Sequence, residues 1–186
     1  MKVEKLVLNC VYDLRTNCYI VTKNDKSIII DPGGEANRII DFCRDKNVVG
    51  ILITHHHPDH IGALQELEDF YGIKASVEID GFDFQVLKTP GHASDSLTYY
   101  FFEDNIMFTG DFLFYHTIGR TDLPTSSVEE MKNSLEMISK FPLATIIYPG
   151  HGKSTILKEE VSRFNTYFEW WEKFSKNKGD VEKLNN

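Results

Sequence analysis

The stretch THHHPDH, residues 54–60, decides how this chain folds and what it can hold. It follows the apolar run 49–53, which is typical of a buried strand, so His55 and His57 should project to one side of the extended chain and the histidine between them to the other. The proline then turns the chain into a helix, and the aspartate and histidine after it can face the same cavity from another direction. Neutral imidazoles with a carboxylate suit Zn²⁺, Fe²⁺ or Mn²⁺ better than Ca²⁺ or Mg²⁺, which prefer oxygen ligands. The stretch therefore predicts a metal site at the end of a strand.

Three later segments each combine a strand-like run, a glycine and a potential metal ligand. They are LKTPGH at 87–92, MFTGD at 107–111 and IIYPGH at 146–151. Glycine lets the backbone turn sharply where a strand ends, so the next side chain can be aimed at a point in front of the sheet. A single His or Asp in such a turn is usually a solvated loop residue. Together with the histidine cluster, the three turns predict a shared target.

The remaining pattern alternates between strands and helices. Short β-branched runs at 2–9, 17–22 and 27–31 predict a strand meander, and a helix over 35–46 before a strand at 49–54 predicts a β-α-β step in a layered α/β architecture. The later elements expected are a helix at about 60–71, strands at 74–79, 82–89, 96–103 and 105–109 with Asp80-Gly81 as a tight hairpin, a helix over 127–140 capped by Ser126 or Ser127, a short strand at 145–148, and a terminal helix from Leu157 to about Phe174 with Phe164, Tyr167, Phe168 and Trp171 toward the core.

Length and charge limit the function classes. A chain of 186 residues is expected to form one domain, residues 1–186, with a polar tail that frays from about residue 176. The 20 Lys and Arg against 28 Asp and Glu give a formal net charge of −8, which disfavours nucleic acid as a partner.

No apolar run is long enough for a membrane span, and the first ten residues lack the apolar region of a signal peptide, so we expect a cytoplasmic protein without a membrane partner. The three cysteines have no CxxC spacing and are expected to be buried thiols.

The cluster His55-x-His57-x-Asp59-His60, followed in the sequence by His92, Asp111 and His151, resembles the metal-ligand signature of the metallo-β-lactamase-fold hydrolases. The resemblance extends from the turn DPGG at 31–34 to the motif PGHG at 149–152. It implies an α/β (α+β) fold, a four-layer αββα sandwich with the site at one edge of its two sheets. It also implies two divalent metal ions, most readily zinc, with iron or manganese as alternatives. One ion would be held by His55, His57 and His92 and the other by Asp59, His60 and His151, with Asp111 bridging.

The same resemblance implies a hydrolase in which the two metals share a bridging hydroxide. Asp59 and Asp111 would be its catalytic carboxylates, which orient the imidazoles or water. The segment 110–124 is similar to the small bacterial glyoxalase II-like (hydroxyacylglutathione hydrolase-like) group and also to persulfide dioxygenases. For the first group the expected small-molecule substrate is a thioester such as S-lactoylglutathione. Arg120 is the candidate substrate anchor; alternatively, it pairs with Asp122 and stabilises its loop. The short spacing from His60 to His92 leaves glutathione recognition open, and the sequence does not specify the oligomeric state.

Other activities remain open. A mononuclear iron persulfide dioxygenase would use a facial triad resembling His55, His92 and Asp111. Retention of the second ligand group favours hydrolysis over that reaction. A lactonase and a non-catalytic metal-binding module are further alternatives, although structural zinc sites are usually closed and rich in Cys. The β-lactamases proper resemble a pattern with Cys at the position of Asp111, so we do not expect an antibiotic-hydrolysing role.

Overall fold

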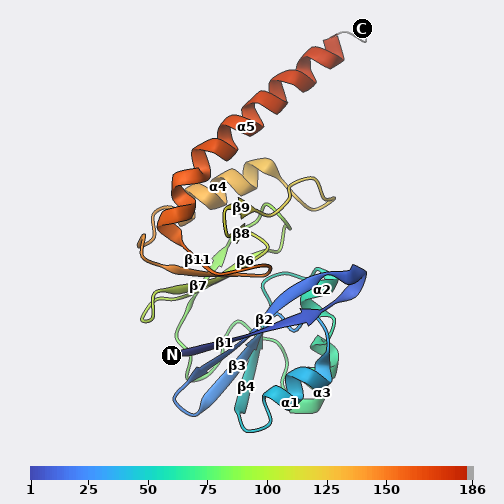
Figure 1. Cartoon of the computed structure of the whole chain (residues 1–186), viewed down its shortest axis with the longest axis vertical. Coiled ribbons are helices and arrows are strands. Elements are labelled where there is room, and N and C mark those ends of the chain that lie inside the picture. Colours follow the sequence, from blue (N-terminus) through green and yellow to red (C-terminus); the bar gives the residue numbers. More distant parts are fainter. Residues whose placement is uncertain (184–186) are drawn as a thin grey trace.

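The computed structural model describes the backbone of residues 1–183 and the side chains of residues 1–173, and it contains two sheets that face each other (Figure 1). The first sheet has the order β1-β2-β3-β4, in which only the β3–β4 pair is parallel. Its strands are β1 (Lys2–Asn9), β2 (Arg15–Lys23), β3 (Lys26–Ile30) and β4 (Asn47–Leu52). The short helix η1 (Val11–Asp13) forms the tip of the β1–β2 hairpin.

The second sheet has the order β11-β10-β7-β6-β5, with β10 and β7 parallel. Its strands are β5 (Gln85–Lys88), β6 (Leu97–Phe101), β7 (Ile106–Gly110), β10 (Ile146–Pro149) and β11 (Thr155–Ile156). A separate small hairpin joins β8 (Leu113–Phe114) to β9 (Thr117–Ile118).

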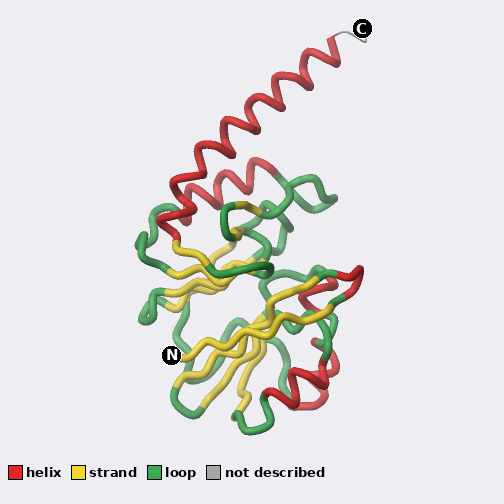
Figure 2. Tube along the Cα trace, in the orientation of Figure 1, coloured by secondary structure: helices red, strands yellow, loops and turns green. Residues whose placement is uncertain are grey.

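Helices cover the outer face of each sheet. The first sheet carries α1 (Ala36–Phe42), α2 (Pro58–Ile61) and α3 (Leu64–Tyr71), and the second carries α4 (Val128–Ile138) and α5 (Leu157–Lys183). Figure 2 shows the two strand layers, in yellow, between the outer helices, in red. The predicted four-layer αββα sandwich is confirmed.

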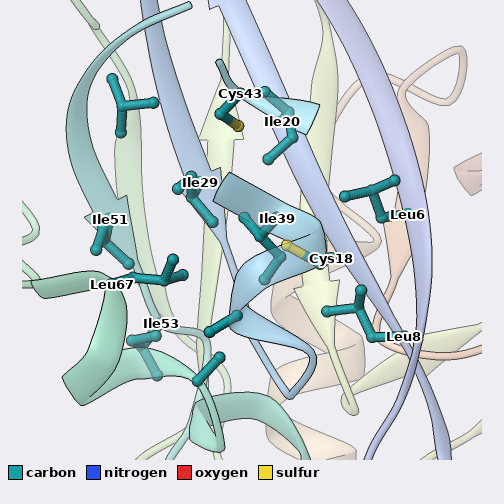
Figure 3. Packing of buried hydrophobic residues seen from close by; sticks show 13 residues of the cluster. Leu6, Leu8, Cys18, Ile20, Ile29, Ile39, Cys43, Ile51, Ile53 and Leu67 are labelled. Atoms are coloured by element: carbon teal, nitrogen blue, oxygen red, sulfur yellow. The ribbon is translucent and has the colours of Figure 1, made fainter. Parts of the chain in front are cut away.

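Three clusters of buried side chains fill the three spaces between the four layers. The strands alternate with period two, so Cys18 and Ile20 of β2 face the helices α1 and α3, while Tyr19 and Val21 face the second sheet. Figure 3 shows the cluster between the first sheet and α1 and α3, in which Ile39 lies among strand residues. The third cluster joins the second sheet to α4 and α5 and contains the predicted aromatic residues Phe164 and Trp171, with Tyr167 and Phe168 packed partly buried against it.

The predicted strand 74–79 and the Asp80-Gly81 hairpin are wrong, and the strand predicted over 82–89 is limited to β5. The segment before β5 is irregular because three of its apolar side chains pack into the space between the sheets instead of pairing in a ladder. Phe82 is buried there, Ile79 and Phe84 pack partly buried against the same cluster, and Ile79 lies on Gly50 of β4. Burial of alternate residues therefore imitated the strand pattern.

Two helix predictions also need correction. The helix expected over 60–71 is broken at Gly62 and Ala63 into α2 and α3, because the N–H of Ala63 donates to the carbonyl of Pro32 at 2.9 Å. The terminal helix continues past Phe174 to Lys183, beyond the predicted end, and fraying of the tail stays a prediction because residues 184–186 lie outside the described part of the chain. The predicted cap of α4 is confirmed, since the Ser127 hydroxyl accepts from the N–H of Glu130.

Two further expectations can be compared with the described residues. Cys18 and Cys43 are buried free thiols as predicted, whereas Cys10 is half-buried. Within residues 1–183, none of the helices combines the length and the apolar character that crossing a membrane requires.

Candidate metal centre

The predicted ligands come together where strands of both sheets end. His55 and His57 follow β4, and α2 begins directly after them with Pro58 at its first turn, which places Asp59 and His60 one residue further along. The other three side chains follow strands or strand-like turns of the second half of the chain, and they are His92, Asp111 and His151. The sequence-predicted convergence of all seven side chains is therefore present in the structure.

Three imidazoles form the first half of the site. The Nδ1 atom of His57 lies 3.0 Å from Nε2 of His55 and 2.9 Å from Nε2 of His92. These nitrogens lie within 4.8 Å of one another, which allows one ion to contact all three. His56 points away, as the strand alternation predicts: it is exposed, and its Nδ1 lies 2.7 Å from the carboxylate of Asp95.

The second half combines imidazoles with carboxylates. His60, Asp59 and His151 again offer ligand atoms within 4.8 Å of one another, and Nε2 of His151 lies 3.3 Å from an oxygen of Asp59. The carboxylate of Asp111 lies between the two halves, with oxygens 3.2 Å from His60 Nε2, 3.3 Å from His151 Nε2 and 3.6 Å from His92 Nε2. This position is the one expected for a bridging ligand.

The outward-facing nitrogens of His60, His92 and His151 each have a partner that fixes the ring. Nδ1 of His60 lies 2.9 Å from the Asp31 carboxylate, which also accepts from the backbone N–H and hydroxyl of Thr54. Nδ1 of His92 lies 3.1 Å from the backbone carbonyl oxygen of Arg120, and Nδ1 of His151 lies 2.7 Å from that of Arg15. Such contacts leave the inward nitrogen available for a ligand bond and fix the ring orientation.

Glycine keeps the space in front of the carboxylates open. A Cβ atom on Gly150 would overlap Oδ1 of Asp111 and lie 2.6 Å from Cε1 of His60. A Cβ atom on Gly119 would overlap the backbone carbonyl of Asp111 and lie 2.9 Å from Cβ of His92. The turns at these positions therefore need glycine, because side chains occupy the space at Gly150 and the Asp111 backbone occupies it at Gly119.

Burial keeps two imidazoles of the first half, those of His55 and His92, neutral. It lowers the pKa of His55 to about 3, and it lowers the pKa of His92 in the same direction. A neutral imidazole has a free lone pair, which is the form that binds a metal.

The second half attracts positive charge. Burial alone would raise the pKa of the Asp59 carboxyl, but hydrogen bonding from His151 and the charge of His60 lower it to about 2. Burial likewise opposes ionisation of Asp111, whose pKa is nevertheless well below its usual range because of His151 and His60.

The two histidines shift in the opposite direction. Burial would lower the pKa of His60, yet Asp31 and Asp111 hold it well above its ordinary value. The His151 pKa rises to about 10 because its hydrogen bonds to Asp111 and Asp59 outweigh burial. Two ionised carboxylates therefore hold cationic partners at this point.

Two buried atoms test whether the residues fit a metal. Nε2 of His60 and Oδ1 of Asp111 are buried and lie 3.2 Å apart, but they do not form a hydrogen bond with each other or with another described residue. Buried polar atoms are almost always satisfied, so a pair aimed at each other across the site calls for a ligand. A divalent cation would satisfy both atoms and balance the carboxylates. The donor set of nitrogen and carboxylate oxygen fits zinc, iron or manganese.

The structure pairs Arg120 with Asp122. Nε and an Nη atom of Arg120 donate to the two carboxylate oxygens at 2.7 and 2.9 Å, and both side chains are exposed. This is the geometry of the loop-stabilising alternative for Arg120. The Arg120 side chain also lines a cavity of about 400 Å³ that includes Tyr167 and Trp171.

Sequence reasoning missed two residues that support the ligands. Asp31 was noted only as part of a turn, although it follows a strand as the predicted ligands do, and this position could have suggested a role. The hydroxyl of Thr16 donates to the Asp59 carboxylate at 2.9 Å. No local signal marks Thr16, because its contact depends on how β2 packs beside α2.

The chain shares its sequence pattern and its fold with known proteins. The profile of the metallo-beta-lactamase superfamily matches residues 11–80 and 68–151. The chain is 31% identical to a probable metallo-hydrolase of Streptococcus pyogenes, over 77% of this chain and 82% of that protein. It is 30% identical to the hydroxyacylglutathione hydrolase GloC of Haemophilus influenzae, over 77% of this chain and 89% of that protein.

Solved structures agree with these relatives. The fold is similar to that of the BLEG-1 B3 metallo-beta-lactamase, with a TM-score of 0.80 and 27% identity, covering 87% of this chain and 97% of that one. It is also similar to ETHE1 from Myxococcus xanthus, with a TM-score of 0.76 and 25% identity, covering 88% of this chain and 84% of that one.

Replacing Gly150 by Ala should weaken metal binding. The new methyl group would occupy the space beside Asp111 and His60, so we expect Gly150→Ala to lose at least one metal equivalent, measured by mass spectrometry of the purified protein. Gly152→Ala is the matched control: its added Cβ meets no atom within 4 Å, although its positive φ of 76° predicts a stability loss of about 1 kcal/mol. Equal metal content in the two variants would contradict the assignment of this space.

Replacing Asp31 by Asn should weaken metal binding through His60. The amide keeps the size of the side chain but removes the negative charge beside Nδ1, and loss of such a partner weakens affinity by about 10- to 100-fold. The measurement is competition for zinc against a chromophoric chelator. Unchanged affinity would show that the Asp31–His60 contact has no influence on the site.

Proposed function

The chain belongs to the metallo-beta-lactamase superfamily, and from its site we propose a two-metal hydrolase that cleaves an acyl thioester such as S-lactoylglutathione. The observation that carries the proposal is the convergence of seven His and Asp side chains around two buried atoms that form no hydrogen bond, Nε2 of His60 and Oδ1 of Asp111. The hydroxyacylglutathione hydrolase of Haemophilus influenzae, a relative at 30% identity, supports the thioester as the substrate class.

In this proposal the ligands divide into two groups. His55, His57 and His92 would hold one ion and Asp59, His60 and His151 would hold the second, with the Asp111 carboxylate available to both. Zinc is the first candidate, and iron or manganese are the alternatives. Such a pair of ions would lower the pKa of water toward about 7 and polarise the carbonyl of the substrate.

The chain's own residues organise this chemistry. Asp111 contacts His60 in one half and His92 in the other, so its carboxylate fixes the position of the two ligand groups relative to each other. Asp59 accepts a hydrogen bond from Thr16 and faces His151, which leaves it a fixed acceptor at the rim of the site. A thiol has a pKa of about 8.5, so a thioester can release its thiolate without first being protonated. The proposal therefore needs no dedicated general acid.

A mononuclear iron persulfide dioxygenase is the second candidate. The structural similarity to ETHE1 from Myxococcus xanthus supports it. The complete second group of Asp59, His60 and His151 supports the hydrolase instead, because a facial triad would not require these residues. Oxygen consumption with a glutathione persulfide separates this reaction from thioester cleavage, and a panel with a lactone and a β-lactam tests the remaining hydrolase substrates.

We expect Asp111→Ala and His57→Ala to reduce thioester hydrolysis to the background rate. Each variant removes a predicted metal ligand that lies in contact with at least two other predicted ligands. The measurement is release of free thiol from S-lactoylglutathione and simpler acyl thioesters, with circular dichroism to check that the fold is kept.

His56→Ala is the matched control within the same cluster. Its side chain points to solvent and Asp95, so this variant should keep its activity. Turnover retained in either Asp111→Ala or His57→Ala would contradict the two-metal mechanism.

A further inference from the structure

A second cavity shares a wall with the metal centre. It has a volume of about 470 Å³, and its lining is mainly apolar, consisting of Phe114, Tyr115, Thr117, His151, Gly152 and Lys153. His151 belongs to both places, because its Nε2 faces Asp59 and Asp111 while its ring lies 6.0 Å from that of Phe114. A molecule in this cavity would therefore lie directly beside the predicted reaction centre.

Lys153 brings a positive charge to the cavity that no carboxylate neutralises. Its ammonium lies 3.6 Å from the ring centroid of Tyr115, and no carboxylate of the residues with described side chains lies within salt-bridge distance of it. Other lysines of this acidic chain, such as Lys23 and Lys26, pair with carboxylates. An unpaired ammonium beside an aromatic wall is available for an anion.

The wall that carries Lys153 is held in place from the first sheet. The carbonyl of Gly152 accepts from Nδ2 of Asn17 at 3.0 Å and from the ammonium of Lys5 at 2.9 Å. Lys5 adds a second positive charge next to the cavity, and within the described side chains it also lacks a salt-bridge partner. This side of the site is therefore both fixed and locally basic, in a chain whose net charge is −8.

Arg120 is less suited to bind an anion. Both carboxylate oxygens of Asp122 already accept from its guanidinium. A substrate carboxylate would have to displace this bidentate pair, whereas at Lys153 it would meet a cation without a competing anion.

We propose that this cavity binds a carboxylate-bearing arm of the substrate, with the Lys153 ammonium contacting the carboxylate and Phe114 and Tyr115 packing against the apolar part. The inference rests on the proposed hydrolase function and narrows it: the substrate class is a thioester that carries a free carboxylate on one side of the bond that is cleaved. The anchor of that carboxylate is Lys153, in place of Arg120.

Turnover tests the specificity. The zinc-loaded enzyme is assayed with a carboxylate-bearing aryl thioester and with its methyl ester. Lys153→Met keeps most of the side-chain length and removes the charge, so the ratio of kcat/KM for the acid over the ester should fall about tenfold, mainly through KM, as expected for loss of a charged hydrogen bond. Lys140→Met is the control: Lys140 is an exposed lysine in the turn that follows α4, and the variant has the same change in net charge. An equal ratio in the two variants would overturn the assignment of Lys153.

Binding tests the cavity without turnover. Titration calorimetry of zinc-loaded protein with phenylacetate and phenylacetamide should show a preference for the carboxylate that Lys153→Met loses and Lys140→Met keeps. A preference unchanged in Lys153→Met would show that the carboxylate binds elsewhere, for example at the metal, and would overturn the inference. A Lys153-dependent preference in a protein that cleaves no thioester would contradict the proposed function and still support the anion subsite.

Discussion

The carboxylates of Asp59 and Asp111 must be matched by positive charge, because both are largely buried between the ends of the two sheets. In the protein alone, His60 and His151 supply that charge, and their raised pKa values express it. Divalent ions can supply the same charge and release those protons. The rest of the site follows from this requirement, since neutral imidazoles on the other side provide further donors without adding charge.

The fold meets this requirement by making chain segments from both halves end at one place. Asp31 links the ends of β3 and β4 through its hydrogen bonds to Thr54, and the same carboxylate orients His60. From the second sheet, Gly150 lets the chain pass close to Asp111. The buried clusters between the four layers hold the two sheets together, so distances between ligands from different halves are fixed by core packing more than by local structure.

The sequence predicts the parts of this structure that depend on local geometry. Strand alternation separates His57 from His56, and the repeated pattern of a strand, a glycine and a ligand identifies Asp111 before any coordinates are known. Contacts between residues far apart in the sequence are harder to predict from it. The burial of Ile79 between the sheets looks like strand alternation, and the contact of Thr16 with Asp59 depends on packing that no local pattern records. The break between α2 and α3 has the same origin, since a hydrogen bond to the carbonyl of Pro32 ends the first helix.

If the seven side chains form a centre for two metal ions, the purified protein should carry both. The measurement is the identity and stoichiometry of metal per chain, by mass spectrometry on protein without a tag, purified without chelator from cells supplied with both zinc and iron. We expect about two equivalents, mainly zinc or a mixture of metals. One equivalent of iron per chain, with no second metal, would be inconsistent with a two-metal centre and would favour persulfide oxidation.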